Sequence, residues 1–264
     1  MKRTMALLVL LAMSALPALA QDWAKQRLEK SPRHGEWIEV KHGARTVRAF
    51  VVYPEAKQKA AAVIVIHEIF GLTDWVRTVA DELAANGYIA IAPDLLSGAG
   101  PNGGGSDSFP DVDARRAAIG KLDPDQITAD LNAVADYVTK LPAANGKLAV
   151  GGFCWGGGQT FRFATNRKDL KAAFVFYGPP PKEFANITAP VYGFYGGNDA
   201  RINATIPDTQ KAMKDAKKKY EPVTYEGAGH GFMRAGEDPA NTNPANTTAR
   251  AAAWKRWLAL LKKM

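Results

Sequence analysis

Cysteine is nearly absent from this sequence, which contains one in 264 residues, at Cys154. A disulfide within the chain is therefore excluded, and so is thiol exchange of the Cys-x-x-Cys kind. The sequence also lacks a cluster of side chains at metal-ligand spacing, a phosphate-cradling motif and an internal repeat. We therefore expect a protein that uses no metal and no other cofactor.

Long apolar runs are also scarce. Lys2 and Arg3 precede an apolar run from Ala6 to Met13, and Ala18-Leu19-Ala20 has the small-x-small pattern of a cleavage site. Because this run is too short to span a bilayer, we interpret residues 1–20 as a secretory signal that is cleaved before Gln21. The mature protein is then expected in the periplasm or outside the cell, without membrane contact. In an oxidising compartment, an unpaired cysteine indicates a reactive thiol or intermolecular pairing.

The charge is positive, with a formal value of +8 that falls by two when Lys2 and Arg3 are removed. Basic residues gather in 211–219 and 250–263, where the pattern is that of amphipathic helices with a solvated face. An exported protein without a recognition motif is not expected to bind nucleic acid. The positive field can instead attract anionic small molecules.

Segments with strand and helix patterns alternate along residues 21–264, which predicts one α/β domain with a mostly parallel sheet. Two segments fall outside this alternation: residues 22–32 are expected to form a loosely held arm, and 97–110 a flexible loop near the site. The predicted strands are 36–42, 46–53, 61–66, 88–92, 147–153, 172–177, 191–195 and 222–225. The predicted helices are 74–86, 111–120, 124–141, 159–165, 206–220 and 247–262.

The glycine-rich stretch around Cys154 carries the clearest chemistry. Gly152-Phe153-Cys154-Trp155-Gly156 fits the G-x-nucleophile-x-G pattern between a predicted strand and a predicted helix. Such a turn exposes the central side chain at the carboxyl end of the sheet, and the helix N-terminus favours a thiolate there. The alternative is a glycine-rich turn around a buried structural cysteine.

A thiol nucleophile needs a base and a group that orients the base. Of the four histidines, His34 and His42 are expected far from the carboxyl edge, and His67 ends a strand. His230 follows the last strand within a glycine-flanked loop, and Asp199 follows the strand before it. The order Cys154, Asp199, His230 is the nucleophile, acid, base order of α/β-hydrolases, so we predict a catalytic triad.

With these residues assembled, the chain resembles the dienelactone hydrolase family over about residues 36 to 260. The resemblance rests on four motifs: His67-Glu68-Ile69-Phe70-Gly71, Gly152-Phe153-Cys154-Trp155-Gly156-Gly157, Gly196-Gly197-Asn198-Asp199 and Gly229-His230-Gly231-Phe232-Met233-Arg234. It implies the α/β-hydrolase fold, with a mostly parallel central sheet of about eight strands and helices on both faces. Departures are the bulky Trp155, the extra glycines of 98–111 and the signal sequence.

The resemblance also implies roles for further residues. Glu68 corresponds to a carboxylate that helps to generate the thiolate, and the backbone amides of Ile69 and Trp155 would bind the oxyanion. Arg234 matches an arginine that holds a substrate carboxylate. A second such arginine would be Arg115 or Arg116, for which a helix-surface position is an equal alternative.

These observations favour an exported hydrolase of a lactone or small ester, similar to a carboxymethylenebutenolidase, that works through a thioacyl enzyme. Two alternatives remain: a broad-specificity carboxylesterase, and a non-catalytic binding or thiol redox protein on the same scaffold. We expect a monomer whose partner is a small-molecule lactone or ester.

Overall fold

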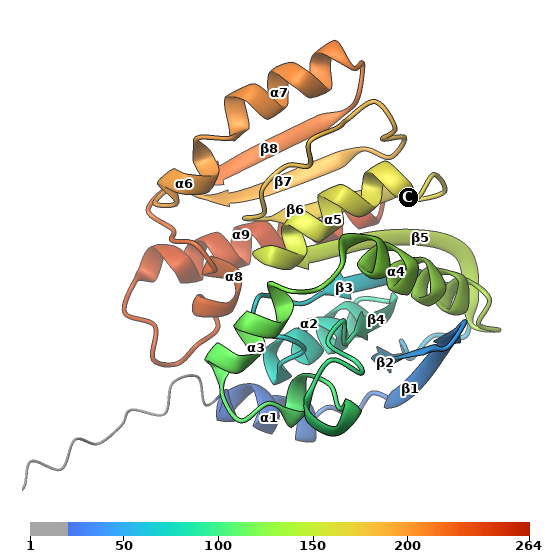
Figure 1. The fold of residues 1–264 in the computed structure, drawn as a ribbon. Coiled ribbons are helices and arrows are strands. Elements are labelled where there is room, and N and C mark those ends of the chain that lie inside the picture. Colours follow the sequence, from blue (N-terminus) through green and yellow to red (C-terminus); the bar gives the residue numbers. More distant parts are fainter. Residues whose placement is uncertain (1–20) are drawn as a thin grey trace, which may run out of the picture.

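The fold is built around one eight-stranded sheet with the strand order β1-β2-β4-β3-β5-β6-β7-β8 (Figure 1). A computed structural model describes residues 21–264, so the predicted signal sequence lies outside the described residues. The pairs β1/β2 and β2/β4 are antiparallel and the other pairs are parallel. The predicted α/β-hydrolase architecture, with about eight mostly parallel strands, is confirmed.

The element boundaries follow the hydrophobic pattern closely. The strands are β1 Gly35–His42, β2 Arg45–Val52, β3 Ala60–Ile66, β4 Ile89–Pro93, β5 Ala144–Phe153, β6 Ala172–Phe176, β7 Val191–Gly196 and β8 Tyr220–Tyr225. The helices are α1 Asp22–Glu29, α2 Asp74–Ala85, α3 Val112–Ile119, α4 Pro124–Thr139, α5 Trp155–Asn166, α6 Ala200–Asn203, α7 Ile206–Asp215, α8 Phe232–Ala235 and α9 Pro244–Leu261, with short 3-10 turns η1 Pro101–Gly103 and η2 Ser106–Ser108.

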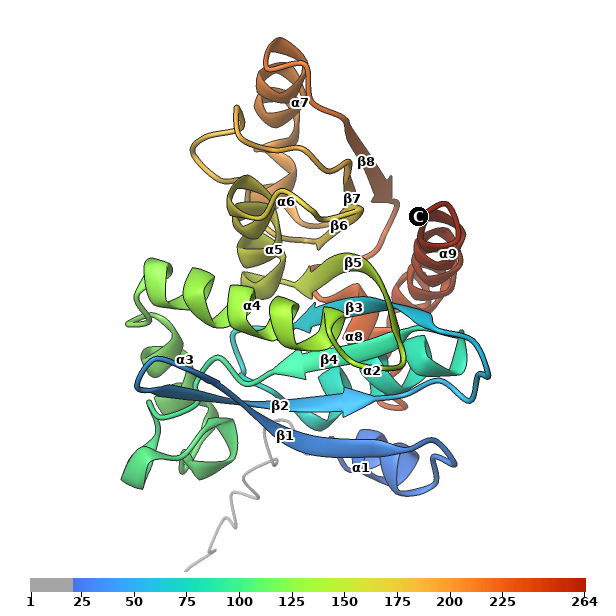
Figure 2. The same cartoon turned by 90° about the vertical axis from the view of Figure 1, so that its right-hand side faces the viewer.

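Helices cover both faces of the sheet (Figure 2), and a cluster of buried apolar side chains lies on each face. Helices α1, α2 and α9 pack on one face, where Trp75 and Trp257 are fully buried. Helices α4, α5 and α7 pack on the other face, with Leu131, Phe161 and Met213 among the buried side chains. The central strands are buried on both faces, which is why they read as continuous apolar runs in the sequence.

The segment 22–32 is not a loosely held arm, and this prediction was wrong. It forms α1, whose Arg27 pairs with Glu82 at 3.0 Å and with Glu237 at 3.1 Å. Just beyond the helix, the Arg33 side chain pairs with the buried Asp81. Since these partners are remote in sequence, the local composition of the segment could not reveal that it docks.

The loop 97–110 is also more ordered than predicted. Asp94, at the end of β4, is buried and accepts hydrogen bonds from the backbone N–H of Ser106 at 2.7 Å and from its hydroxyl at 2.6 Å. The Ser106 hydroxyl oxygen in turn accepts from the backbone N–H of Leu72 at 2.9 Å. This buried chain of hydrogen bonds ties the loop to the segment that follows β3.

The β1–β2 hairpin reaches further toward the functional edge than the sequence suggested. Because β2 runs antiparallel to β4, with Ala49 opposite Pro93, its first residues lie beyond the carboxyl ends of the parallel strands. His42, expected far from this edge, therefore lies beside it, and its Nε2 is 2.8 Å from Asp130 of α4. His34, at the opposite end of the hairpin, is exposed and stacks on Tyr53.

Candidate active site

Cys154 occupies a sharp turn between β5 and α5. Its backbone has φ 55° and ψ −116°, a conformation that costs a non-glycine residue free energy and is typical of functional positions. A Cβ at Gly156 would lie 2.3 Å from the carbonyl oxygen of His67, and one at Gly152 would lie 2.3 Å from that of Gly156. The glycines of the motif are therefore required for close backbone approach, and the half-buried thiol lies at the carboxyl edge of the sheet.

Two backbone amides flank this turn. Neither Ile69 N–H nor Trp155 N–H donates a hydrogen bond within residues 21–264. The turn between β5 and α5 packs directly against the end of β3. No side chain would fit between Gly156 and the His67 carbonyl, and the His67 and Trp155 rings stack with centroids 5.4 Å apart. Free amides at a helix N-terminus beside a nucleophile can stabilise an oxyanion.

His230 and Asp199 lie together beside the thiol. His230 Nδ1 is 2.5 Å from Asp199 Oδ2, and the Asp199 carboxylate is buried at 6% exposure. The pKa of His230 is raised to about 9, chiefly by the neighbouring Cys154 side chain and also by the hydrogen bond to Asp199, while burial opposes the rise. The structure thus joins two of the predicted triad residues, His230 and Asp199, by a hydrogen bond, and Cys154 is near enough to His230 to raise its pKa.

Glu68 is engaged by Arg234. Arg234 Nε donates to Glu68 Oε2 at 2.8 Å, and the two side chains are 19% and 3% exposed. Burial raises the pKa of Glu68, and the neighbouring Arg234 and His230 partly offset that rise. No hydrogen bond joins Glu68 to Cys154 among the described residues. Glu68 is therefore held by the arginine, close to the thiol–imidazole pair.

The two alternative arginines occupy different environments. Arg115 Nη1 donates to the Phe70 carbonyl oxygen at 3.2 Å, and its buried Nε has no partner among residues 21–264. Arg115 and Phe70 line a hollow of about 200 Å³. Arg116 is exposed and forms a 3.5 Å surface pair with Asp113. The structure therefore brings Arg115, and not Arg116, to the segment that carries Ile69.

Tyr177 is a site residue that the sequence analysis missed. Its side chain is fully buried at the end of β6, with a positive φ of 41°. Its ring packs edge-on against His230 at 5.1 Å, and its hydroxyl has no hydrogen-bond partner within residues 21–264. Burial, with the negative charge of Glu68, raises the pKa of Tyr177 well above its usual value. A neutral hydroxyl donor is therefore available beside Glu68 and Cys154.

His67 was assigned only a strand-end position, but it supports the oxyanion segment. It is fully buried, the Leu95 N–H donates to its Nε2 at 3.3 Å, and its Nδ1 is 2.8 Å from the Glu68 carbonyl oxygen. With Nε2 accepting, the ring proton lies on Nδ1 and donates to that carbonyl. Burial lowers the pKa of His67, so the ring is neutral and positions the backbone leading to Ile69.

Within residues 21–264, no group of three or more acidic, histidine or cysteine side chains is arranged to hold a metal ion. None of the helices in the same part of the chain is long and apolar enough to cross a bilayer.

The fold, the nucleophile turn and the acid–base pair at successive strand ends define the class of α/β-hydrolases. The profile of the dienelactone hydrolase family matches residues 47–264. The chain belongs to this family, and the resemblance inferred from its motifs is confirmed. It is a hydrolase that acts on ester or lactone bonds of small molecules.

Several relatives support this assignment. A Salmonella typhimurium protein named "Putative carboxymethylenebutenolidase" is 34% identical over 200 residues, which are 70% of this chain and 72% of that protein. A Saccharolobus solfataricus protein of the same name is 31% identical over 252 residues, covering 83% and 94% of the two chains. A solved structure titled as a putative dienelactone hydrolase, from Klebsiella pneumoniae, has a TM-score of 0.77 at 27% identity and covers 88% of this chain and 99% of its own.

Proposed function

We propose that this protein hydrolyses a carboxylate-bearing lactone or small ester through a thioacyl enzyme formed on Cys154. The observation that carries the proposal is the position of His230, whose Nδ1 is 2.5 Å from Asp199 Oδ2 and whose pKa is raised chiefly by the neighbouring Cys154 side chain. A base between a nucleophile and an orienting carboxylate is the arrangement that acyl transfer requires.

Acylation begins with the thiolate of Cys154 and the imidazolium of His230. The sulfur forms a bond to the substrate carbonyl carbon, and the carbonyl oxygen becomes an oxyanion that accepts hydrogen bonds from the Ile69 and Trp155 amides. Each such donor stabilises the transition state by on the order of 3 kcal/mol. When the oxyanion collapses, the C–O bond of the ester breaks and His230 gives its proton to the departing oxygen.

Deacylation reverses the proton movement. Neutral His230, oriented by Asp199, removes a proton from water as the water oxygen attacks the thioester carbonyl. Collapse of this second intermediate releases the carboxylic acid, which gives its proton to solvent, and restores the Cys154 thiolate beside protonated His230. For a lactone, the departing oxygen remains attached to the product, so the net reaction is ring opening by one water molecule.

Arg234 supports an anionic substrate. Its guanidinium is one-fifth exposed and already pairs with a carboxylate, that of Glu68, at 2.8 Å. A substrate carboxylate that binds Arg234 competes with Glu68 for the same donor. Glu68 then loses its counter-charge in a buried site and becomes a stronger proton acceptor. It can take the proton from Cys154 in molecules where that residue is still a thiol, which gives the thiolate from which acylation begins. Tyr177 is placed to donate its free hydroxyl to the displaced carboxylate.

A broad-specificity carboxylesterase is the second candidate. The half-exposed thiol and the bulky Trp155 are compatible with neutral esters, which need no contact with Arg234. The two candidates share the triad chemistry and differ in how strongly activity depends on substrate charge.

The test is a panel of anionic lactones, neutral lactones and aryl esters, assayed with the native protein and with Cys154→Ala. Loss of all hydrolysis in Cys154→Ala and after alkylation of the single thiol, with an unchanged circular dichroism spectrum, is the expected result. Activity retained by Cys154→Ala would refute the thioacyl mechanism, and hydrolysis of no member of the panel would favour the binding or redox alternative.

We further propose that the protein is exported. The support is the sequence of residues 1–20, with its basic start, apolar run and Ala18-Leu19-Ala20 site. N-terminal sequencing of protein from fractionated cells is expected to give Gln21 as the first residue in the exported fraction. A protein that keeps Met1 and stays in the cytoplasm would contradict this proposal.

A further inference from the structure

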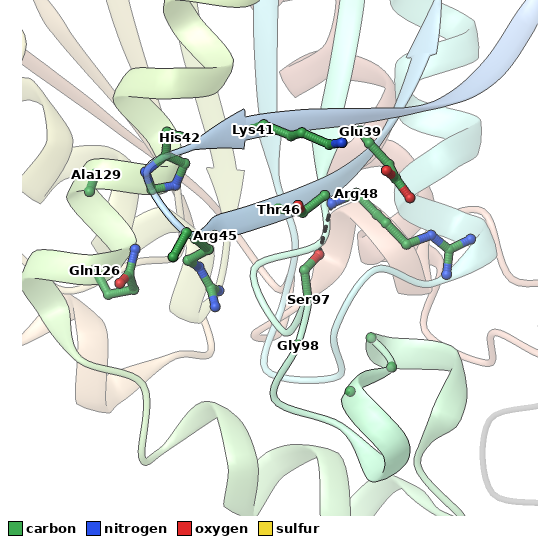
Figure 3. A pocket seen from close by; sticks show the side chains of 14 residues that line it. Glu39, Lys41, His42, Arg45, Thr46, Arg48, Ser97, Gly98, Gln126 and Ala129 are labelled. Carbon is green, nitrogen blue, oxygen red and sulfur yellow. Dashed lines mark hydrogen bonds between the residues drawn. The ribbon is translucent and has the colours of Figure 1, made fainter.

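A second hollow lies at the tip of the β1–β2 hairpin, away from the nucleophile. It has a volume of about 770 Å³ and is bounded by the hairpin, the glycine loop after β4 and the start of α4 (Figure 3). None of Cys154, His230 or Arg234 lines it. This volume is in the range of small-molecule sites.

Cationic side chains dominate the lining of this hollow. Lys41, Arg45 and Arg48 are permanently charged near neutral pH, and Glu39 is the one carboxylate among the lining residues. Across the hairpin, Glu39 is directly opposite Arg48, yet no hydrogen bond or ion pair joins them within residues 21–264. The lining side chains themselves therefore carry a net positive charge, and two acids outside the lining, Asp130 and Asp107, pair with Arg45 and Arg48.

Arg45 is held in place by a buried carboxylate. Its Nε lies 2.8 and 2.9 Å from the two oxygens of Asp130, which is 1% exposed and also accepts from Gln126 at 2.9 Å. Because Asp130 engages only Nε, both Nη groups of Arg45 lack hydrogen-bond partners among the described residues. Nη1 faces Gly98, where a Cβ would be 3.7 Å away. A fixed guanidinium with two free donors is preorganised for a carboxylate or phosphate.

Arg48 supplies a second, separate donor group. Its guanidinium stacks over Trp37 at 4.7 Å, and its contact with the exposed Asp107 is long, at 3.5 Å. An ion pair of this kind is weak and readily exchanged. Figure 3 shows the Arg45 and Arg48 side chains on either side of Ser97, both reaching below the hairpin.

The opposite wall is formed largely by glycine backbone. Gly103, Gly104 and Gly105 line the hollow, and a Cβ at Gly103 would meet no atom within 4 Å. At Gly103 this leaves room for a ligand close to the backbone, whereas a Cβ at Gly104 or Gly105 would meet Ser108 or Asp94 within the loop. The two cations stand on the hairpin across from this wall.

From this arrangement we propose that the hollow is a binding site for an extended small molecule with two anionic groups, one held by Arg45 and one by Arg48. Because Arg45 and Arg48 are three positions apart on β2, their side chains leave the strand on opposite faces, one toward Asp130 of α4 and the other toward Trp37. A ligand that binds both therefore needs two separate anionic groups and cannot be one small ion. The site is independent of the hydrolytic centre.

The experiment is calorimetric titration at constant ionic strength. The probes are adipate, with two carboxylates, and fructose 1,6-bisphosphate, with two phosphates, and hexanoate and inorganic phosphate are the matched single-anion controls. At least one double anion is expected to bind saturably and about tenfold more tightly than its control, because its second group binds intramolecularly. Which probe binds distinguishes the carboxylate from the phosphate source.

Arg48→Gln is expected to weaken this binding by about ten- to a hundredfold, the cost of one charge-assisted contact. Lys255→Gln, which makes the same charge change on α9, should leave binding unaffected. Arg45→Gln should weaken binding as strongly as Arg48→Gln does. It also removes the partner of the buried Asp130, so if the Arg45→Gln variant fails to fold, Arg48→Gln alone decides the test.

Alkylation of Cys154 separates this site from the hydrolytic one, and binding should be the same before and after it. The proposal is overturned if neither double anion binds, if Arg48→Gln binds as the native protein does, or if alkylation abolishes binding. Equal weakening by Arg48→Gln and Lys255→Gln would also overturn it, since that result reports only the overall charge.

Discussion

Two pairs of an acidic and a basic side chain lie at the carboxyl edge of the sheet, and they differ in whether they can transfer a proton. His230 and Asp199 are 2.5 Å apart, with side chains 33% and 6% exposed, and the imidazole has a pKa of about 9. Arg234 and Glu68 are 2.8 Å apart, and their side chains are 19% and 3% exposed. Unlike the imidazole, the guanidinium does not lose its proton near neutral pH. The His230–Asp199 pair can transfer a proton, whereas the Arg234–Glu68 pair is broken only when another anion replaces Glu68 at the guanidinium.

Because of this difference, the two pairs near Cys154 have separate roles. A proton-transferring pair serves every substrate, because each ester must gain and lose a proton during hydrolysis. A pair that is broken only by an anionic substrate makes the reactivity of the thiol depend in part on the charge of the substrate.

Breaking the first pair should have the largest effect. His230→Gln removes the base and acid, so kcat/KM should fall by about 10² to 10⁴-fold on anionic and neutral substrates alike. Steady-state kinetics on a matched anionic lactone and aryl acetate check this. The control for loop disturbance is Asn246→Ala, which loses the contact to the Gly229 amide and the hydrogen bond to Asn241. A loss confined to one substrate would be inconsistent with a shared proton-transfer role.

Breaking the second pair should separate the substrates. Arg234→Ala should lower kcat/KM on the anionic lactone by about ten- to a hundredfold, and on the neutral ester much less. Equal losses on both would remove the argument for an anionic substrate.

Arg234→Ala should also lower the free energy of unfolding by about 3 kcal/mol near pH 7, because it leaves Glu68 buried without its counter-charge. Without Arg234 the pKa of Glu68 rises further above its ordinary value, so the variant should regain stability as the pH falls and the carboxylate takes up a proton. Urea unfolding at pH 5 and pH 7 measures this. Adding Glu68→Gln to Arg234→Ala should abolish the pH difference, and a difference that persists would assign it to another group.

The two neighbouring arginines of α3 should differ modestly. Arg115→Ala removes the hydrogen bond to the Phe70 carbonyl and should lower kcat/KM several-fold by loosening the oxyanion segment, a cost of about 1 kcal/mol. Arg116→Ala breaks only an exposed pair and should change neither activity nor stability measurably. Parallel kinetics on the two variants compare them directly, and equal effects would show that the Phe70 contact has no role.

The smallest effect concerns stability against pH. The pKa of His230 is raised from 6.5 to about 9, so its stabilising contribution is complete below pH 6.5 and is lost as the pH rises through 9. Cys154→Ala removes the largest cause of this shift, so its melting temperature should decline less than that of the native protein between pH 6.5 and 9. Identical slopes for the two proteins would show that the thiol does not hold the imidazole proton.

The sequence by itself determined the class of fold and the triad candidates. Apolar runs and helical spacing reflect burial directly, so the eight strands and most of the longer helices were predicted within a few residues. The predicted helix 206–220 was too long, because α7 ends at Asp215, Lys217 has a positive φ of 57° and β8 begins at Tyr220. The strand-turn-helix signature located Cys154, and chain order located Asp199 and His230, because successive parallel strands bring their carboxyl ends to one edge.

Only the tertiary structure decided the rest, because the contacts involved join residues remote in sequence. Helix α1 docks through Arg27 to Glu82 and Glu237, and nothing in its own composition predicts that. Likewise, the pairing of Glu68 with Arg234 spans 166 positions. The buried hydroxyl of Tyr177 and the free guanidinium face of Arg45 become apparent only when the surrounding atoms are in place.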